Sequence, residues 1–389
     1  MKIKIAILGS TGSIGKTTLQ IIKKKSNLFK VDTLVAKSNY DLILKQIRKF
    51  KPDNFIITDK KNYLRIKKIK NIKTNICYNI NELNNKKNKI DITIAAIPGL
   101  AGLEPTIFFL TRSKKILLAN KESIICGWKI IKKIANKNKT KIIPIDSEHF
   151  SINNLAANHK NADIEKIYIT ASGGPFLKLA YNKFNKIKPD QAINHPKWKM
   201  GKKISVDSST LMNKILELLE AKNIFDYDFS KYEIIIHPQS LVHAIVKLKN
   251  GITKFLYHEP NMIIPISNAI FNNNVNIDSL IKFNKKKDKI KNLEFLNVDK
   301  KRFPIIKILP KLNKYESTAI IINAANEELV NHFLKRKVSY NSIIKYIFQV
   351  LKDKNYKKYA IQKPSTLSKI YKIDKWTRQK VKFLLKQND

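Results

Sequence analysis

Two short segments carry residues whose types and spacing suit metal chemistry. The first contains Asp146 and Glu148 on either side of Ser147, directly after an apolar run. On an extended segment, side chains two residues apart point the same way, so both carboxylates can face one cation. The second contains Glu217, in a stretch whose apolar residues repeat with helical spacing. Three carboxylates completed by water suit Mg²⁺ or Mn²⁺ better than Zn²⁺, which favours His and Cys.

The second segment also supplies donors for a phosphate group. Asn213 and Lys214 precede Glu217 by four and three residues, so they lie on its side of the expected helix. Ser208 and Ser209 stand before this helix as N-cap candidates. Each pattern has a plain alternative, because Asp-x-Glu pairs are common at solvated strand ends and serines at helix starts are usually only caps. The argument for an active site therefore depends on a further motif.

A glycine-rich turn near the N-terminus is that motif. The residues Gly9-Ser10-Thr11-Gly12-Ser13-Ile14-Gly15 follow the apolar segment 3–8 and precede a segment of helical period. A dinucleotide-binding loop needs this context because bare backbone N–H groups and a helix N-terminus must approach a pyrophosphate. Where an NAD site has an acidic residue, about 20 residues further on, the chain has Lys37-Ser38-Asn39. A cation there favours the 2′-phosphate of NADPH. The alternative for the glycine motif is a turn that serves only to pack the helix on the strand.

The elements that must position these residues follow from hydrophobic periodicity. Residues 1–145 alternate strand and helix, with strands at 3–8, 31–36, 55–58, 92–97, 116–118 and 141–145. This alternation predicts an α/β fold with a Rossmann-like parallel sheet covered on both faces. Residues 146–271 indicate a second, central α/β domain that ends in a hairpin, 241–248 and 252–257, with its turn at Asn250-Gly251. We expect a linker at 272–299 and a C-terminal helical domain at 300–389.

The composition limits the class of protein. The chain has 389 residues, of which 43% are hydrophobic, enough for more than one domain. Its 76 Lys and Arg against 30 Asp and Glu give a net charge of +46, which would ordinarily suggest a nucleic-acid partner. The excess is mostly Lys, spread along the chain with Asn and Ile, and these three residues share A/T-rich codons. Mutational bias is the simpler cause, so we expect no nucleic-acid partner.

The remaining features concern location and the histidines. We expect no membrane span, because no run of 18 apolar residues occurs, and no leader, because the first expected strand begins at about residue 3. Cys77 and Cys126 lack metal-ligand spacing, which suggests reduced thiols in a cytoplasm. His149, His237 and His243 lie in or beside strand-like runs and are more simply structural. His195, which precedes a Pro and a Trp in a loop, is the better candidate for a site residue.

These residues resemble those of one family, the 1-deoxy-D-xylulose 5-phosphate reductoisomerases. The resemblance runs nearly end to end in ordered blocks: 8–15, 117–123, 144–149, 172–176, 195–201, 203–217, 237–240 and 323–327. It implies rearrangement and reduction of that sugar phosphate to 2-C-methyl-D-erythritol 4-phosphate, in the non-mevalonate isoprenoid pathway. It also implies NADPH and a divalent cation (Mg²⁺, Mn²⁺ or Co²⁺) as cofactors. The family forms homodimers through its central domain, which suggests the sheet containing the hairpin as an interface.

The resemblance assigns roles residue by residue. The metal ligands are Asp146, Glu148 and Glu217, which form the catalytic set with Lys121. Other substrate contacts come from Lys121 and Ser147 at the sugar, and from Ser172, His195, Ser208, Asn213 and Lys214 at the phosphate. NADPH is held by Thr11, Gly12, Ser13, Ile14, Lys37, Ser38, Asn39, Asn120, Glu122 and Gly201. Trp198 and Met200 belong to a mobile flap near 189–202.

The implied reaction has two stages. The metal polarises the substrate's oxygens while a carbon–carbon bond is cleaved and re-formed, in a retro-aldol/aldol route, and hydride from the nicotinamide then reduces the resulting aldehyde. Two other functions stay open from the residues alone. One is a simple NADP-dependent dehydrogenase or semialdehyde reductase, which would not need three converging carboxylates. The other is a basic nucleic-acid-binding protein, which would show steep salt dependence.

Several positions depart from the family pattern. Ile215 stands where Gly normally follows the phosphate lysine. Asn261 and Ile263 replace an Asp and an Arg, and Phe150 replaces a small or amide residue. The pair Lys37-Ser38 occupies the position of a Gly-Lys pair in the family. These changes affect no predicted metal ligand, so we expect them to alter efficiency more than reaction type.

Overall fold

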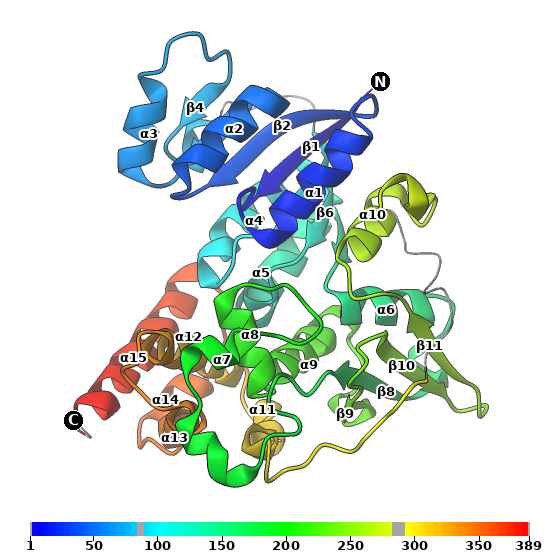
Figure 1. Cartoon of the computed structure of the whole chain (residues 1–389), viewed down its shortest axis with the longest axis vertical. Helices are drawn as coiled ribbons and strands as arrows, with labels where there is room; N and C mark the ends of the chain where they lie inside the picture. The colour runs from blue at the N-terminus through cyan, green and yellow to red at the C-terminus, as the bar shows by residue number, and fades with distance from the viewer. Residues whose placement is uncertain (1, 84–88, 282–291, 388–389) are drawn as a thin grey trace. The chain divides into compact units, whose positions relative to one another are not determined.

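The computed structural model describes residues 2–83, 89–281 and 292–387 (Figure 1). The chain divides into two compact units rather than three. The first unit contains residues 1–123, 130–146 and 262–289, and the second contains 124–129, 147–261 and 290–389. The predicted C-terminal helical domain therefore groups with the central domain.

A parallel sheet of seven strands forms the centre of the first unit, and the parallel sheet was predicted with six of these strands. Its order is β4-β3-β2-β1-β5-β6-β7, with β1 in the middle. The strands are β1 (Ile3–Leu8), β2 (Phe29–Ala36), β3 (Asn54–Ile57), β4 (Asn75–Cys77), β5 (Ile90–Ala95), β6 (Ser113–Leu118) and β7 (Lys141–Pro144). Most of their residues are buried, which is typical of parallel strands covered on both faces. The three-residue strand β4 was not predicted, because it is too short to show a period.

Six α-helices contribute residues to the described part of the first unit: α1 (Ser13–Lys24), α2 (Tyr40–Phe50), α3 (Lys60–Lys67), α4 (Leu103–Leu110), α5 (Lys121–Asn138), of which residues 124–129 group with the second unit, and α10 (Ile263–Phe271). Helix α10 was predicted in the central domain, but Ile263 and Ile266 belong to the hydrophobic core of the first unit. Phe271 meets Phe29 edge-to-face at 5.8 Å. Leu280, predicted in the linker, is also buried in this core, whereas residues 282–291 of that linker lie outside the described residues.

The second unit contains a mixed sheet of order β11-β10-β8-β9. Its strands are β8 (Ile164–Ala171), β9 (Tyr232–Ile236), β10 (Val242–Leu248) and β11 (Thr253–Tyr257). Strands β10 and β11 form the predicted antiparallel hairpin. Gly251 has φ +88°, a left-handed conformation that glycine adopts without a Cβ penalty, and its N–H donates to Leu248 O. The turn chemistry of Asn250-Gly251 therefore predicted this hairpin correctly.

Helices make up the rest of the second unit. They are α6 (Ser147–Ala156), α7 (Pro189–Ala192), α8 (Lys202–Ser209), α9 (Met212–Phe225), α11 (Leu309–Leu312), α12 (Thr318–Leu334), α13 (Tyr340–Leu351), α14 (Tyr356–Ala360) and α15 (Leu367–Lys386). Helices α12, α13 and α15 pack on one another, as the predicted C-terminal helices require. Ile320, Ala324, Leu329 and Phe333 lie buried on α12, as a packed helix in this predicted domain requires. Among the described residues, no helix is both long and apolar enough to cross a membrane.

Candidate active site

The glycine turn connects β1 to α1 in the first unit. The N–H groups of Gly9 and Ser10 donate to Val35 O at 2.9 and 2.8 Å, which holds the turn against β2. A Cβ on Gly15 would lie 2.3 Å from Gly9 O, so only glycine allows this close approach of helix and turn. Gly12 is the N-cap of α1, and no side chain caps the helix there. Its first N–H groups are therefore suited to an anion such as a pyrophosphate.

The residues Lys37, Ser38 and Asn39 follow β2, the neighbour of β1 in the sheet. All three are exposed. Asn39 caps α2 by accepting from Leu42 N at 3.1 Å, and Ser38 O accepts from Asn62 Nδ2 at 2.8 Å. Carboxyl ends of neighbouring parallel strands share one sheet edge, so these residues and the glycine turn lie where a dinucleotide binds in such folds.

Three predicted site residues lie at the start of α5. Asn120 is buried, and its side chain accepts from Ser123 N at 2.6 Å and donates to Gly99 O at 3.0 Å. Lys121 is buried as well, with Nζ 2.7 Å from Asp146 Oδ2. Glu122 lies buried in the first turn. The Asn120 side chain thus positions the helix start, and contacts to a cofactor by Asn120 or Glu122 remain predictions.

Asp146 and Glu148 do not lie on one extended strand, which corrects the prediction. Strand β7 ends at Pro144, and helix α6 begins at Ser147, so Glu148 lies in the first helical turn. An acidic residue is favoured there by the helix dipole. Ser147 Oγ donates to Glu148 Oε2 at 2.8 Å. Asp146 precedes Glu148 by two residues, so their Cα atoms are at most about 7 Å apart whichever conformation the chain takes.

A buried cluster of charges forms between α6 and α9 in the second unit. Lys214 Nζ contacts Glu148 Oε1 and lies 2.7 Å from Glu217 Oε2, and Asn213 Nδ2 donates to Glu217 Oε1. All four side chains are at least nine-tenths buried. Burial alone would lower the pKa of Lys214, but the attraction of Glu148 and Glu217 outweighs it and raises that pKa. The predicted helical side shared by residues 213, 214 and 217 is confirmed.

Ser208 and Ser209 do not cap the helix that carries Glu217. Both belong to the last turn of α8, where Ser209 Oγ donates to Val206 O at 2.7 Å. The helical conformation is interrupted between α8 and α9 at Leu211, which is buried and has φ +65°. Nothing in the local sequence marks this break, because a left-handed conformation is uncommon for a residue other than glycine.

His195 joins the predicted flap to the loop that follows β8. Its Nδ1 accepts from Lys197 N at 3.1 Å and from Trp198 N at 2.9 Å. Its Nε2 lies 2.8 Å from Ser172 Oγ. Because Nδ1 accepts, we assign the ring proton to Nε2, which then donates to Ser172. Burial, with the charge of Lys214, lowers the pKa of His195 to about 4, so the ring is neutral near pH 7.

The other flap residues have fewer contacts that bear on function. Trp198 is half-buried and lies edge-to-face on His243, with ring centroids 5.8 Å apart. Met200 is half-buried, and Gly201 is the exposed N-cap of α8. The predicted roles of Met200 in the flap and of Gly201 toward the cofactor remain predictions.

Two buried polar groups near this site were not predicted. Asp207 on α8 contacts Lys203 at 3.1 Å and accepts from Asn326 Nδ2 at 2.7 Å. His258, which follows β11, stacks on His243 with centroids 3.9 Å apart. The only sequence signal for Asp207 was its place four residues after Lys203, which is common on solvated helices. His258 has no motif of its own.

Three of the departures from the family pattern have local explanations. Ile215 is fully buried on α9, and Ile263 is part of the core of the first unit, which explains an apolar residue at each position. Asn261 donates its backbone N–H to Glu259 O at 2.7 Å, a bond that does not depend on its side chain and leaves the amide unexplained. Phe150 is buried and lies edge-to-face on His258. None of these side chains replaces a member of the charge cluster.

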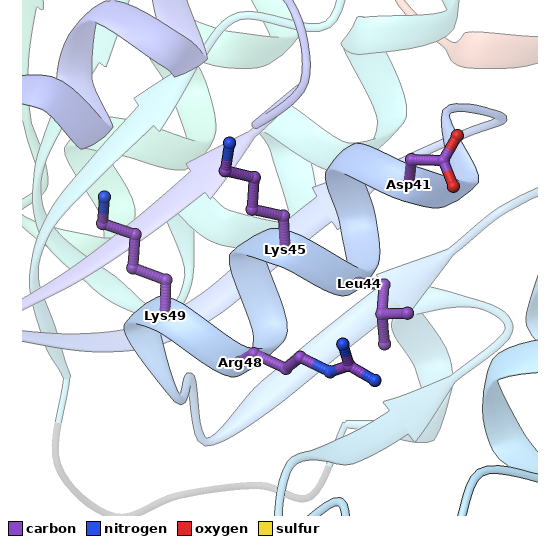
Figure 2. A pocket seen from close by; sticks show the side chains of 5 residues that line it. All are labelled: Asp41, Leu44, Lys45, Arg48 and Lys49. Atoms are coloured by element: carbon purple, nitrogen blue, oxygen red, sulfur yellow. The ribbon is translucent and has the colours of Figure 1, made fainter.

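A hollow on the outer side of α2 involves none of the predicted site residues. It measures about 490 Å³ and is lined by Asp41, Leu44, Lys45, Arg48 and Lys49 (Figure 2). The four charged side chains are all exposed, so no buried polar group is present to hold a ligand. This hollow is a basic surface rather than the site of chemistry.

The fold and these groups together define a class of protein. A glycine turn on the central strand of a parallel sheet, with an uncapped helix N-terminus, is the architecture of a dinucleotide-dependent oxidoreductase. The buried cluster of carboxylates, ammonium and amide adds oxygen ligands suited to a hard divalent cation.

Comparisons with known proteins give the family. Family models match residues 5–127 (1-deoxy-D-xylulose 5-phosphate reductoisomerase), 142–225 (its C-terminal domain) and 258–380 (DXP reductoisomerase C-terminal domain). A 1-deoxy-D-xylulose 5-phosphate reductoisomerase of Pelagibacter ubique is 44% identical, covering 97% of this chain and 98% of that protein. One of Francisella tularensis subsp. holarctica is 38% identical, covering 99% of each. The chain belongs to the 1-deoxy-D-xylulose 5-phosphate reductoisomerase family.

A solved structure agrees with this assignment over the whole chain. It is a DOX-P reductoisomerase in complex with NADPH, fosmidomycin and magnesium, with 32% identity and a TM-score of 0.91. The match covers 99% of this chain and 98% of that one. The similarity in fold therefore extends to both units.

Proposed function

We propose that this protein converts 1-deoxy-D-xylulose 5-phosphate to 2-C-methyl-D-erythritol 4-phosphate with NADPH and a divalent cation. The observation that carries the proposal is the buried cluster of Glu148, Lys214 and Glu217, in a chain that matches the family along its length. The two carboxylates supply ligands for a cation, and the ammonium supplies a hydrogen-bond donor for a phosphate group. A simple dehydrogenase has no use for such a cluster.

The metal ligands are Asp146, Glu148 and Glu217. Three considerations support the fit: the donors are all carboxylate oxygens, Glu148 and Glu217 share one partner, and Asp146 lies two residues from Glu148. Mg²⁺ and Mn²⁺ suit such ligands, and Co²⁺ is acceptable to them. When bound, the cation supplies Lewis-acid polarisation of the substrate's ketone and hydroxyl oxygens.

NADPH is bound through the glycine turn and the residues after β2. The uncapped N–H groups at the start of α1 bind the pyrophosphate, together with Thr11, Gly12, Ser13 and Ile14. The exposed residues Lys37, Ser38 and Asn39 bind the adenosine side of the cofactor. Asn120, Glu122 and Gly201 hold the rest of the cofactor. The exposed ammonium of Lys37 favours NADPH over NADH, because it can pair with the 2′-phosphate.

The substrate is held at both ends by side chains of the charge cluster and the flap. Lys214, Asn213, Ser172, Ser208 and His195 bind the phosphate, and Lys121 and Ser147 orient the sugar's oxygens. Binding energy from the remote phosphate holds the reacting carbons in place. The flap, with Trp198 and Met200, closes over the substrate and excludes water during hydride transfer.

The protein acts as a homodimer in the cytoplasm. Strand β11 is an edge of its sheet. Phe255 on this strand and Ile252 directly before it are each about half exposed (50% and 51%), which suits pairing with a second copy. Phe255→Asp is expected to shift the assembly to monomer in analytical ultracentrifugation. Cys77 and Cys126 are both buried, in keeping with reduced thiols, and cell fractionation tests the location.

An NADPH oxidation assay tests the function. Purified protein is incubated with 1-deoxy-D-xylulose 5-phosphate, with and without Mg²⁺ or Mn²⁺, and the product is identified by mass spectrometry and NMR. We expect oxidation only with substrate and metal together. Turnover that ignores the metal, or a product that keeps the linear carbon chain, contradicts the proposal.

A further inference from the structure

Four rings from separate segments of the second unit form a continuous series of contacts, one stacked and two edge-to-face. Trp198 of the flap lies edge-to-face on His243 of β10, with centroids 5.8 Å apart. His243 lies against His258, after β11, in a stacked arrangement with centroids 3.9 Å apart. His258 meets Phe150 of α6 edge-to-face at 6.4 Å. We call these four residues the ring stack.

The inner rings of the stack are held rigidly. His243, His258 and Phe150 are buried, with exposures of 2%, 7% and 6%. His243 Nε2 lies 3.2 Å from His258 O, and His258 Nδ1 lies 2.8 Å from Glu259 O, so each ring donates one N–H to a backbone carbonyl. These bonds fix the planes of both rings. Burial lowers the pKa of both histidines, to about 3 for His243, so neutral rings can stack without repulsion.

His258 contacts its neighbours through its ring. What the residue offers its neighbours is a flat face toward His243 and an edge contact with Phe150.

We propose that His258 and Phe150 are positioning residues that hold Trp198, through His243, in the place from which the flap closes. The inference rests on the proposed function for the role of the flap. Phe150 lies two residues after Glu148 on α6, so the stack connects the flap to the helix that carries a metal ligand. Phe150, which departs from the family pattern, contacts His258 through its ring.

The test places a reporter at the outer end of the stack. The chain has three Trp residues, and the double substitution Trp128→Phe, Trp376→Phe leaves Trp198 as the single emitter. In this full-length protein we compare His258→Ala with His258→Phe. Four quantities are measured for each: emission maximum and anisotropy of Trp198, KM for 1-deoxy-D-xylulose 5-phosphate, kcat, and thermal midpoint.

His258→Ala is expected to shift Trp198 emission to longer wavelength and to lower its anisotropy. KM should rise about three- to tenfold, the effect of losing one ring contact, while kcat changes less than twofold. His258→Phe is expected to restore most of the fluorescence and KM, since it keeps a flat ring between His243 and Phe150 although it loses the bond from Nδ1 to Glu259 O. Phe150→Leu should resemble His258→Ala more weakly.

The matched control is Phe295→Ala, which removes a ring stacked on His237 at 4.8 Å in the same unit. It should leave Trp198 emission and KM unchanged. The proposal is overturned if His258→Ala leaves Trp198 fluorescence unchanged, if His258→Phe is as impaired as His258→Ala, or if Phe295→Ala has the same effect. If the parent protein does not turn over the substrate, the proposed function fails, and the fluorescence comparison still decides the role of the stack.

Discussion

The glycine turn of the first unit and the charge cluster of the second are built on opposite principles. The turn presents backbone N–H groups whose positions follow from β1, α1 and the close approach of Gly15 to Gly9. The cluster presents side chains that satisfy one another, since Lys214 pairs with both Glu148 and Glu217. The first site is ready for its ligand, whereas the second carries its own counter-ion.

This difference affects how the binding of metal, substrate and NADPH is coupled. Lys214 neutralises the same carboxylates that a divalent cation would bind, and a buried ammonium beside a bound cation is unfavourable. Metal binding therefore requires a new anion for Lys214, and the substrate's phosphate is the anion proposed for it. We expect metal and substrate to bind cooperatively, while NADPH binds independently of the metal.

The largest expected effect is on turnover, from Glu217→Gln. The amide keeps the shape but removes a charge that binds the cation and Lys214, so kcat should fall roughly 100-fold or more. NADPH binding, measured by the fluorescence of the reduced nicotinamide, should be unchanged. Glu233→Gln, at an exposed pair with Lys166, is the matched control and should retain full activity. Near-normal turnover of Glu217→Gln would remove the cluster from the chemistry.

The next effect is on stability, from Lys214→Met. Without the ammonium, the buried carboxylates of Glu148 and Glu217 lose the counter-ion that they share, so the free energy of unfolding should fall by about 3 kcal/mol without metal. Added Mn²⁺ should recover much of this loss, because it binds the folded state alone. Urea unfolding with and without Mn²⁺ measures the difference.

The control for this prediction is Lys166→Met, which breaks a surface ion pair and should cost under about 1 kcal/mol. A Mn²⁺ effect equal in the parent protein and in Lys214→Met would show that metal and ammonium do not compete for the same carboxylates.

A pair of glycine substitutions tests the turn. A Cβ on Gly15 would lie 2.3 Å from Gly9 O, so Gly15→Ala should lower the free energy of unfolding by about 2 kcal/mol. A Cβ on Gly12 meets only Gly9 O, at 3.3 Å, so Gly12→Ala should keep the fold. It should crowd the pyrophosphate and raise KM for NADPH about tenfold. Equal losses of stability in both variants would contradict this division of roles.

The turn and the cluster also differ in how far the sequence predicts them. The turn was predictable because its signals are local: an apolar strand, three glycines and a helical period within residues 3–22. Helical spacing predicted the side that Lys214 and Glu217 share, but the position of Glu148 was not predictable. The strand before Asp146 ends at Pro144, and the expected alternation of side chains stops with it.

Other features depend on contacts between distant segments. The left-handed Leu211 ends one helix and starts the next without a glycine to announce it. Helix α10 packs in the first unit because Phe271 reaches Phe29, a pairing that no local pattern contains. The stack of His258 on His243 needs the register of the hairpin, which sequence periodicity gives only to within a few residues.

The smallest expected effect concerns acid stability and His195. Its pKa is about 4 in the folded protein against about 6.5 in an unfolded chain, so between these values the unfolded state binds the extra proton. Stability from His195 is therefore complete above pH 6.5, falls as the pH is lowered toward 4, and stays constant below. His195 is part-exposed, so the loss should be on the order of 1–2 kcal/mol.

His195→Gln removes this proton, so its free energy of unfolding should change less between pH 6.5 and 4 than that of the parent protein. Urea titrations across this range measure the difference, with His332→Gln on α12 as the matched control outside the flap. The physical reason is specific: Nδ1 accepts from Lys197 N and Trp198 N, and a proton on it would break both bonds. A parent protein that gains stability relative to His195→Gln as the pH falls would show that His195 is charged in the fold, and that the neutral contact holding the flap to Ser172 is wrong.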